Sequence, residues 1–551
     1  MEHYGLLGII PPLLAIILAL VTKEVIISLT LGILSGTLII SHGNVFTAIT
    51  IFTDKVAEMS SDAWNIRILL FCALLGAFVS MLSKTGATKA FGLWASKYLK
   101  TKKSILIFTW FFGLIIFIDD YFNSLSVGTV MRPVSDQNKI SRAKLAYILD
   151  STAAPVCILA PISTWVVTVM SYIRDSEGFE SLNISEFIFF IKMIPYSVYP
   201  LLALAFVVLI SLVFKDFGPM KRSEENAQNG KLFDEELYGA CPGNMETSSN
   251  NKAKWYDMVI AILVLIIVCI VMFPVTTYMG LVGSNGITAF SQAMSSISLN
   301  QAFLDTDASK ALFYGAVISL MIMYIYYVAR RLLSVRSAGN SIMEGVKSMV
   351  PALVVLALAW SIGSVIKSSP ADGGLGLAAF LSEAVKGGGF PLWILPAIGY
   401  LLGCVIAFST GTSWGTFAIL IPIVIPIANG LAAANGYTDN ALLNVLLINV
   451  GSVVSGAVFG DHCSPISDTT ILSSTGSNCP LLEHVATQIP YAGLVAISAF
   501  IGVVIGGITL NPIVALLTGF IVMCVLALLA PKFYDKIASF KKSYLNKNII
   551  K

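Results

Sequence analysis

Long apolar segments recur along almost the whole chain, and they constrain its fold more than any other feature. A transmembrane helix needs about 20 consecutive, mostly apolar residues. Several segments meet or approach that length, so we expect an all-α polytopic membrane protein with about 11 spans. The segments are 5–21, 25–40, 66–83, 143–173, 187–214, 257–275, 311–329, 350–366, 441–475, 489–508 and 511–530.

The composition supports this fold class and excludes several others. Hydrophobic residues make up 56% of the chain and charged residues 12%, whereas a soluble domain carries about 25% charged residues. The net charge is only +3, which is too little for a nucleic-acid-binding surface. The sequence shows no motif for a cofactor or for a nucleophile paired with a base. We therefore expect neither an enzyme nor a cofactor.

Two of the apolar segments, 143–173 and 441–475, are too long for one straight span. Each carries helix breakers near its middle, and proline in particular removes a backbone donor and clashes with the preceding turn. We therefore expect two broken helices. The breakers are Pro155 and Pro161 in the first segment and Gly460 and Pro465 in the second.

Two further stretches form pairs of short apolar arms, 104–118 with 121–134 and 391–407 with 413–428. Several arms fall below the spanning length, so each pair predicts a re-entrant hairpin with a polar tip. The alternative is that every arm crosses, which gives fifteen spans. The polar tips contain Asp119, Asp120, Asn123 and Ser124 in the first pair, and Ser409, Thr410, Gly411, Thr412 and Ser413 in the second.

Loop charge predicts the orientation, because cytoplasmic loops are enriched in Lys and Arg. One set of segments holds 20 basic and 3 acidic residues, and comprises 84–103, 132–144, 330–347 and 532–551. The complementary set holds 5 basic and 12 acidic residues, and comprises 41–65, 174–186, 276–310, 367–390 and 429–440. We therefore expect the basic set and the C-terminus in the cytoplasm and the N-terminus outside.

The order of elements repeats within the chain. Three spans, a hairpin, a broken span and one further span make up 1–214, and the same order recurs in 257–508. Basic segments flank the first hairpin and acidic ones the second, so the halves should run in opposite directions, as in inverted-repeat secondary transporters. The polar segment 215–256 fits a cytoplasmic linker, and 509–551 an extra span with a basic cytoplasmic tail.

Ionisable side chains at membrane depth are costly, so they indicate functional sites. Five carboxylates and one histidine fall at the predicted tips and breaks, with no Lys or Arg among them, which favours a cation site. These residues are Asp119, Asp120, Asp150, Asp461, His462 and Asp468. Asp461 and Asp468 are the leading candidates to hold Na⁺ or a proton, and His462 could adjust their protonation.

Hydroxyl and amide side chains surround these groups and could add the oxygen ligands that suit Na⁺. They are Asn123, Ser124, Ser151, Thr152, Thr410, Thr412, Ser413, Ser464, Ser467 and Thr469. Each hydroxyl could instead bond the backbone of its own helix. Likewise, Asp119, Asp120 or Asp461 could cap a helix, and His462 could be a structural, hydrogen-bonded histidine.

Two motifs carry a family resemblance. The segment from Phe459 to Pro480, FGDHCSPISDTTILSSTGSNCP, resembles the signature region of the NhaC family of bacterial Na⁺/H⁺ antiporters. The segment 118–136, IDDYFNSLSVGTVMRPVSD, resembles the matching motif of the first half. The resemblance covers most of the chain apart from 215–256 and the tail. It implies the architecture of the ion-transporter superfamily, with a scaffold domain, a moving transport domain and often a homodimer.

The residues and the resemblance together predict a Na⁺/H⁺ antiporter of the bacterial plasma membrane that works by alternating access. The NhaC-like proteins also include malate/lactate exchangers and amino-acid transporters. The alternative is therefore a Na⁺- or H⁺-coupled carrier or exchanger of a small organic acid or amino acid. The expected partners are Na⁺, H⁺ and the lipid bilayer, with a homodimer and a small organic substrate as further partners and no nucleic acid.

Overall fold

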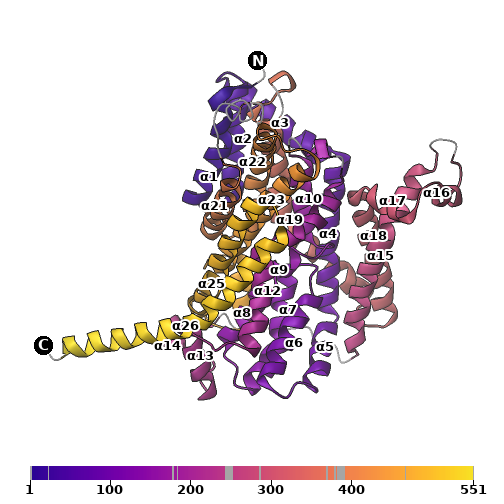
Figure 1. The fold of residues 1–551 in the computed structure, drawn as a ribbon. Helices are drawn as coiled ribbons and strands as arrows, with labels where there is room; N and C mark the ends of the chain where they lie inside the picture. The colour runs from indigo at the N-terminus through magenta and orange to yellow at the C-terminus, as the bar shows by residue number, and fades with distance from the viewer. Residues whose placement is uncertain are drawn as a thin grey trace.

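The computed structural model describes residues 3–22, 24–176, 179–182, 184–241, 252–283, 287–367, 370–377, 380, 391–465 and 467–549. Every regular element within these ranges is helical, which confirms the all-α fold class (Figure 1). Parts of the predicted linker 215–256 and of the loop 367–390 lie outside the described residues.

The first half of the chain forms several N-terminal helices, followed by a helical hairpin, a broken helix and one further long helix. The main elements are α1 (Ile10–Thr22), α2 (Val25–Ile40), α4 (Ala63–Lys84), α6 (Lys102–Ile115), α7 (Asp120–Gln137), α8 (Arg142–Thr152), α9 (Ala154–Cys157), α10 (Thr164–Arg174) and α12 (Val198–Leu212). The connecting elements are α3 (Val45–Ser61), α5 (Ala87–Ser96) and α11 (Glu186–Met193).

The second half of the chain is also helical. Its main elements are α15 (Trp255–Leu281), α18 (Ala308–Ala329), α19 (Val335–Lys367), α21 (Ile394–Thr410), α22 (Ser413–Ala434), α23 (Asp439–Cys463), α24 (Asp468–Ser477) and α25 (Leu481–Thr509). The remaining helices are α13 (Gly218–Gln228) and α14 (Glu235–Tyr238) between the halves, α16 (Phe290–Ser296), α17 (Leu299–Leu304) and the C-terminal α26 (Pro512–Ile549).

The apolar helices make this an integral membrane protein. Eight helices of the described residues are long and apolar enough to cross a membrane, or nine when the pair Glu186–Tyr196 and Val198–Leu212, bent by 51°, is taken as one span. Helices shorter than 18 residues, such as α21, are not among these eight. The expected total of 11 spans, the inverted direction of the two halves and the domain limits therefore stay predictions.

Both predicted hairpins form as pairs of helices with a short break at the tip. The first comprises α6 and α7, and the side chain of Asp119 caps α7 by accepting from the Phe122 amide at 3.0 Å. The second comprises α21 and α22, and Gly411 ends α21 in the left-handed conformation with φ of 70°. Glycine adopts this conformation at little steric cost. Because α22 has a spanning length, the re-entrant depth of this hairpin stays a prediction.

Both predicted broken helices are also interrupted. The first breaks between α8 and α10, where Pro155 opens the short α9 and Pro161 lies in the non-helical stretch that follows. The second breaks between Cys463 and Asp468, around Pro465. Gly460 does not break this helix, contrary to the sequence-based expectation. It lies inside α23, where an added Cβ would come within 2.3 Å of the Cys404 carbonyl oxygen on α21, so its small size serves helix packing.

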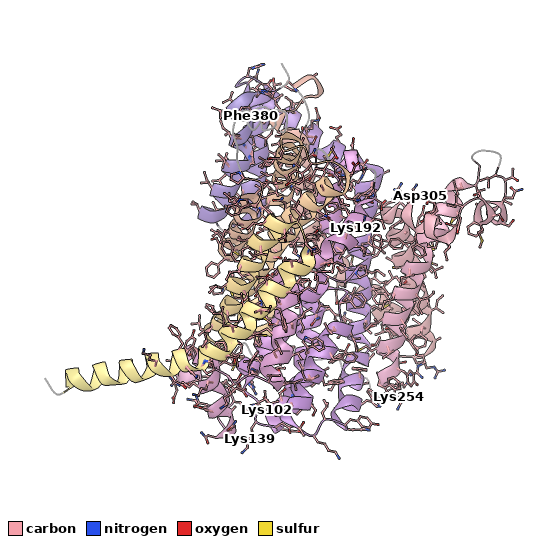
Figure 2. The ribbon with its side chains drawn as sticks, viewed as in Figure 1. Lys102, Lys139, Lys192, Lys254, Asp305 and Phe380 are labelled. Carbon is pink, nitrogen blue, oxygen red and sulfur yellow. The ribbon has the colours of Figure 1, made fainter. Side chains whose placement is uncertain are left out.

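The predicted basic and acidic loops lie at opposite ends of the helix bundle. Lys102, Lys139 and Lys254 lie at one end and Asp305 and Phe380 at the other (Figure 2). Helix α26 leaves the bundle at the basic end (Figure 1).

Partly buried ion pairs lie at the basic end of the bundle. Glu224 of α13 accepts from Lys102 and from the Ser141 hydroxyl, the latter at 2.7 Å. Lys144 donates to Asp216 at 2.6 Å. Burial raises the pKa of Asp216, but the charge and hydrogen bond of Lys144 outweigh burial and hold that pKa below its usual value.

Candidate functional site

One cavity joins three of the four interrupted elements, and we call it the carboxylate cavity. Its volume is about 160 Å³. The lining residues are Asp119, Asp120 and Tyr121 from the first tip, Thr412 and Trp414 from the second tip, Asp468 from the second break, and Ser348, Met349, Pro351 and Val355 from α19. Three carboxylates line this space without a basic side chain among them. The cavity therefore has the electrostatic character of a cation site.

The first hairpin tip places two adjacent carboxylates in the cavity with different partners. One carboxylate oxygen of Asp119 accepts the hydrogen bond that caps α7. Asp120 accepts from the Trp165 indole at 2.9 Å through Oδ1, while its Oδ2 is buried and has no hydrogen-bond partner. Both side chains are almost fully buried. A buried carboxylate oxygen without a partner is costly unless a proton or a cation satisfies it, so Asp120 Oδ2 is available to hold one.

The second break contributes Asp468 to the same cavity. Its Oδ2 accepts from the Tyr121 hydroxyl on the first hairpin, and its Oδ1 accepts from the Thr469 amide at 3.0 Å. The contact with Tyr121 joins residues that are far apart in the chain. Asp468 is only partly buried, so it offers the cavity a carboxylate within reach of water.

Asp461, one of the two leading sequence candidates, does not line the cavity. Its Oδ2 accepts from the Ser413 amide at 3.1 Å and from the Ser413 hydroxyl at 2.7 Å. Its Oδ1 accepts from the Ser467 hydroxyl at 2.5 Å. These contacts fasten the second hairpin tip to the second broken helix. These hydrogen bonds indicate a structural role for Asp461, as an anchor between the two elements. The predicted role of Asp461 as an ion ligand stays a prediction.

Asp150 and His462 lie outside the carboxylate cavity, in a second buried polar cluster. His462 contacts Ser151 on α8 and Tyr199 on α12. Asp150 contacts His484 and Gln488 on α25. The structure thus divides the six ionisable candidates of the sequence between a cavity, an anchor and a separate cluster.

Of the predicted hydroxyl and amide ligands, only Thr412 lines the cavity. Asn123 donates to the carbonyl oxygens of Gly113, Ile116 and Thr152, which ties the hairpin to the first broken helix. Most of the other side chains bond to backbone or to one another. Ser124 pairs with Ser473, Ser151 with His462, Thr152 with the Ile148 carbonyl, Thr410 with the Ile406 carbonyl, Ser413 with Asp461, Ser464 with the Phe408 carbonyl, and Ser467 with Thr469.

Several residues of the site were missed by sequence reasoning. Tyr121 follows Asp120 and Trp414 follows Ser413, both of which are predicted tip residues. Their positions in the sequence could therefore have indicated that they belong to the site. Trp165, Ser348, His484 and Gln488 lie on α10, α19 and α25 and carried no such signal. Only the packing of these helices against the hairpins brings them to the polar centre.

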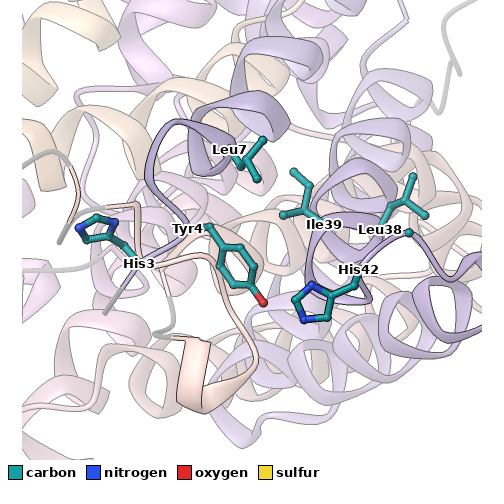
Figure 3. Close-up of a pocket in the computed structure, with 7 residues that line it drawn as sticks. His3, Tyr4, Leu7, Leu38, Ile39 and His42 are labelled. Carbon is teal, nitrogen blue, oxygen red and sulfur yellow. The ribbon is translucent and has the colours of Figure 1, made fainter. Parts of the chain in front are cut away.

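A larger, open pocket lies near the N-terminus and differs in chemistry (Figure 3). Its volume is about 600 Å³, and His3, Tyr4 and His42 line it together with apolar side chains such as Leu7 and Ile39. It has no carboxylate among its lining residues, so it lacks the negative charge that favours a bound cation. Within the described residues, no group of three or more His, Cys, Asp or Glu side chains could hold a metal ion by itself, so a cation in the carboxylate cavity would need other oxygen ligands beside the carboxylates.

Comparison with known proteins identifies the family. Residues 156–508 match the Na⁺/H⁺ antiporter family. The chain belongs to this family. The matched range contains Thr412, Asp461 and Asp468, and the first hairpin precedes it. The match confirms the resemblance seen in the 459–480 motif.

Three relatives show how far the similarity extends. An uncharacterized protein of Haemophilus influenzae is 35% identical over 510 residues, which cover 91% of each chain. The malate-2H⁺/Na⁺-lactate antiporter of Bacillus subtilis is 28% identical over 189 residues, covering 34% of this chain and 35% of the relative. An uncharacterized Na⁺/H⁺ antiporter of Haemophilus influenzae is 35% identical over 113 residues, covering 18% of this chain and 22% of the relative.

Proposed function

We propose that this membrane protein exchanges Na⁺ for protons at the carboxylate cavity. The observation that carries the proposal is the convergence of Asp119, Asp120 and Asp468 in one small cavity without a basic lining residue. Membership of the Na⁺/H⁺ antiporter family supports it. The chain is thus a transporter by family, and Na⁺ and H⁺ are the ions that this family implies.

Competition between the two ions supplies the exchange chemistry. An ionised carboxylate is a pure acceptor, and its oxygens are the hard ligands that suit Na⁺. A proton on the same oxygen removes the negative charge and blocks the cation. Suppose that the protein changes the side of the membrane to which the cavity opens only when Na⁺ or protons occupy the cavity. Each Na⁺ carried in one direction is then followed by protons carried in the opposite direction. Rigid-body rocking of one helix group against the other gives that alternation in inverted-repeat transporters.

The residues that line the cavity support an organic-acid carrier less well than a Na⁺/H⁺ antiporter. A carboxylate substrate is favoured by a positive side chain, for which only helix N-termini can substitute, and the lining residues include no Lys, Arg or His. The malate/lactate relative matches only about a third of the chain.

The cellular setting belongs to the proposal as well. We place the protein in a bacterial plasma membrane, with the basic end of the bundle in the cytoplasm and the N-terminus outside, because of the charge difference between the loops. The lipid bilayer and a homodimer are its proposed partners. The dimer rests on the architecture of similar transporters.

The decisive experiment compares Asp468→Asn with wild-type protein in proteoliposomes. The variant keeps the shape of the side chain and loses its charge, so Na⁺-dependent proton flux should disappear at every pH from about 6 to 9. The matched control is Asp305→Asn, which removes an exposed carboxylate at the far end of the bundle and should transport normally.

The wild-type protein should also show competition. Its apparent Na⁺ affinity should weaken by about tenfold per pH unit for each competing proton on the acid side of the titration, by linkage. A Na⁺ affinity that stays constant over this pH range would contradict the shared site. Flux of labelled malate, lactate or amino acids driven by Na⁺ would instead support the organic carrier.

A further inference from the structure

A second group of buried polar side chains lies beside the carboxylate cavity and is not used by the proposed exchange. We call Asp150, His462, His484 and Gln488 the Asp150 cluster. All four are at most 1% exposed. They come from α8, α23 and α25, so the cluster joins both broken helices to the last helix of the second half.

Asp150 is the centre of the cluster. Its Oδ2 accepts from Gln488 Nε2 at 2.6 Å, from His484 Nε2 at 3.2 Å and from the Thr470 hydroxyl at 3.3 Å. Its Oδ1 has no hydrogen-bond partner, and neither does His484 Nδ1 or Gln488 Oε1. Buried polar atoms are rarely left unpaired in native proteins. The hydrogen bonding around this carboxylate is therefore incomplete.

The charge of the cluster is a separate observation, and it carries the inference. Within the described residues the ion-pair partner of Asp150 is His484, which is charged only when it is protonated. The other titratable groups that face the cluster are neutral or negative. They are Tyr147 on α8, Tyr199 on α12, Asp461 and Cys463 on α23, and Asp468 on α24. A buried carboxylate without a cationic partner is strongly disfavoured, so one additional proton on an imidazole makes the cluster neutral.

The surroundings of His462 suit either protonation state. Its Nε2 lies 3.2 Å from the Ser151 hydroxyl, and its Nδ1 lies 2.8 Å from the Tyr199 hydroxyl. A hydroxyl can donate or accept. Both ring nitrogens therefore stay satisfied when the ring is neutral and when it is an imidazolium. The proton can reside on His484, which contacts Asp150 directly, or on His462.

We propose that the Asp150 cluster is a proton-binding site distinct from the carboxylate cavity, loaded as an imidazolium opposite Asp150 when the cavity lacks Na⁺ and emptied when Na⁺ binds. The inference rests on the proposed antiport function. Helix α24 connects the two sites, because it carries Asp468 in the cavity and, two residues later, Thr470 bonded to Asp150. A cation at Asp468 repels a positive charge in the neighbouring cluster, so Na⁺ binding favours loss of that proton.

The test measures binding of ²²Na⁺ to the purified full-length protein as a function of pH. Asp150→Asn removes the charge that retains the proton but leaves the carboxylate cavity unchanged. In the variant, the slope of log Kd for Na⁺ against pH should be smaller in magnitude by about one. The Kd should therefore change by a tenfold smaller factor per pH unit than in the wild type. Binding at alkaline pH should persist. The control Asp305→Asn should keep the wild-type slope.

The same experiment separates the two proposals. A wild-type slope that is retained in Asp150→Asn overturns the second proton site and leaves the antiport proposal standing. An absence of Na⁺ binding, or a wild-type affinity independent of pH, overturns the antiport proposal itself.

A measurement on the intact cluster covers the case in which Asp150→Asn does not fold. The chain has four histidines, and replacing His3 and His42 by Gln leaves only the two in the cluster. Solid-state NMR of ¹⁵N-histidine in liposomes should then show one imidazolium without Na⁺ and its conversion to a neutral ring on adding Na⁺. The conversion should be lost in Asp468→Asn. Identical imidazole spectra with and without Na⁺ would overturn the inference.

Discussion

At the scale of single residues, the carboxylates differ in what satisfies them. Asp461 has hydrogen bonds to both oxygens, whereas Asp120 has one bonded oxygen and one that is buried and unpaired. Asp461 turns both oxygens to Ser413 and Ser467 and does not line the cavity, whereas Asp120 lines it and keeps one oxygen unpaired. This difference is why we place Asp120 in the ion site and treat Asp461 as an anchor.

The hydrogen bond from Trp165 should tune Asp120. Trp165→Phe removes the indole donor, and a hydrogen bond to a charged group is worth about 1.5–3 kcal/mol. The bond favours the ionised form of Asp120 over the protonated form, so its loss strengthens competition by protons, and the Na⁺ concentration for half-maximal exchange should rise by about tenfold or more. The matched control is Trp360→Phe, because Trp360 is equally buried and its indole nitrogen has no hydrogen-bond partner. Equal effects of the two substitutions on exchange would show that the bond to Asp120 is unimportant.

At the scale of elements, close helix crossings hold the interrupted helices in place. An added Cβ at Gly456 of α23 would lie 2.0 Å from the Tyr400 carbonyl oxygen of α21. At Gly476 of α24 it would lie 2.5 Å from the Ser124 carbonyl oxygen of α7. Backbone cannot move away as a flexible side chain can. These glycines therefore set how closely α21 and α7 pack against the two parts of the second broken helix.

Gly456→Ala should destabilise the protein by forcing α21 and α23 apart. Overpacking of this kind costs about 1–3 kcal/mol, so the thermal unfolding midpoint of the detergent-purified protein should fall. Gly493→Ala is the control, because a Cβ there meets no atom within 4 Å and alanine favours the helix. A Gly456→Ala variant that melts with the wild type would mean that the crossing adjusts without cost.

At the scale of the whole molecule, charge separates the two ends of the bundle. Lys102 and Lys139 belong to basic segments at one end, and Asp305 belongs to an acidic segment at the other (Figure 2). The ion pairs of Lys102 with Glu224 and of Lys144 with Asp216 bind the segment after α12 to the basic end. The polar chain between the halves is thus packed onto the helices where it is described.

Labelling of single cysteines should fix the orientation. Lys100 and Asp305 are exposed, and the native Cys241, Cys404 and Cys524, which are partly exposed, would be replaced first. In intact cells an impermeant maleimide should label Asp305→Cys and spare Lys100→Cys, because the basic end should face the cytoplasm. Both should react after permeabilisation. The reverse pattern in intact cells would invert the proposed topology.

Much of the architecture could be predicted from the sequence because it depends on local properties. Apolar length defines the helices, the prolines Pro155 and Pro465 mark the breaks, and the two pairs of short arms form helical hairpins. The scarcity of charge inside these segments also made Asp119, Asp120, Asp150, Asp461 and Asp468 visible as candidates. Gly460 was misread because a glycine that breaks a helix and one that admits a neighbouring backbone look the same in sequence.

The tertiary structure alone decided which candidates act together. Asp461 and Asp468 are seven positions apart, yet Asp468 lines the cavity with Asp119 and Asp120, while Asp461 turns to Ser413. The α19 residues that line the cavity, and the contacts of Trp165 and His484, come from packing between helices that are distant in the chain. Residue type and spacing reveal which groups can bind a cation or a proton, but the distances between them depend on how the helices cross. That crossing is set by close contacts such as Gly456 with Tyr400, which no local pattern encodes.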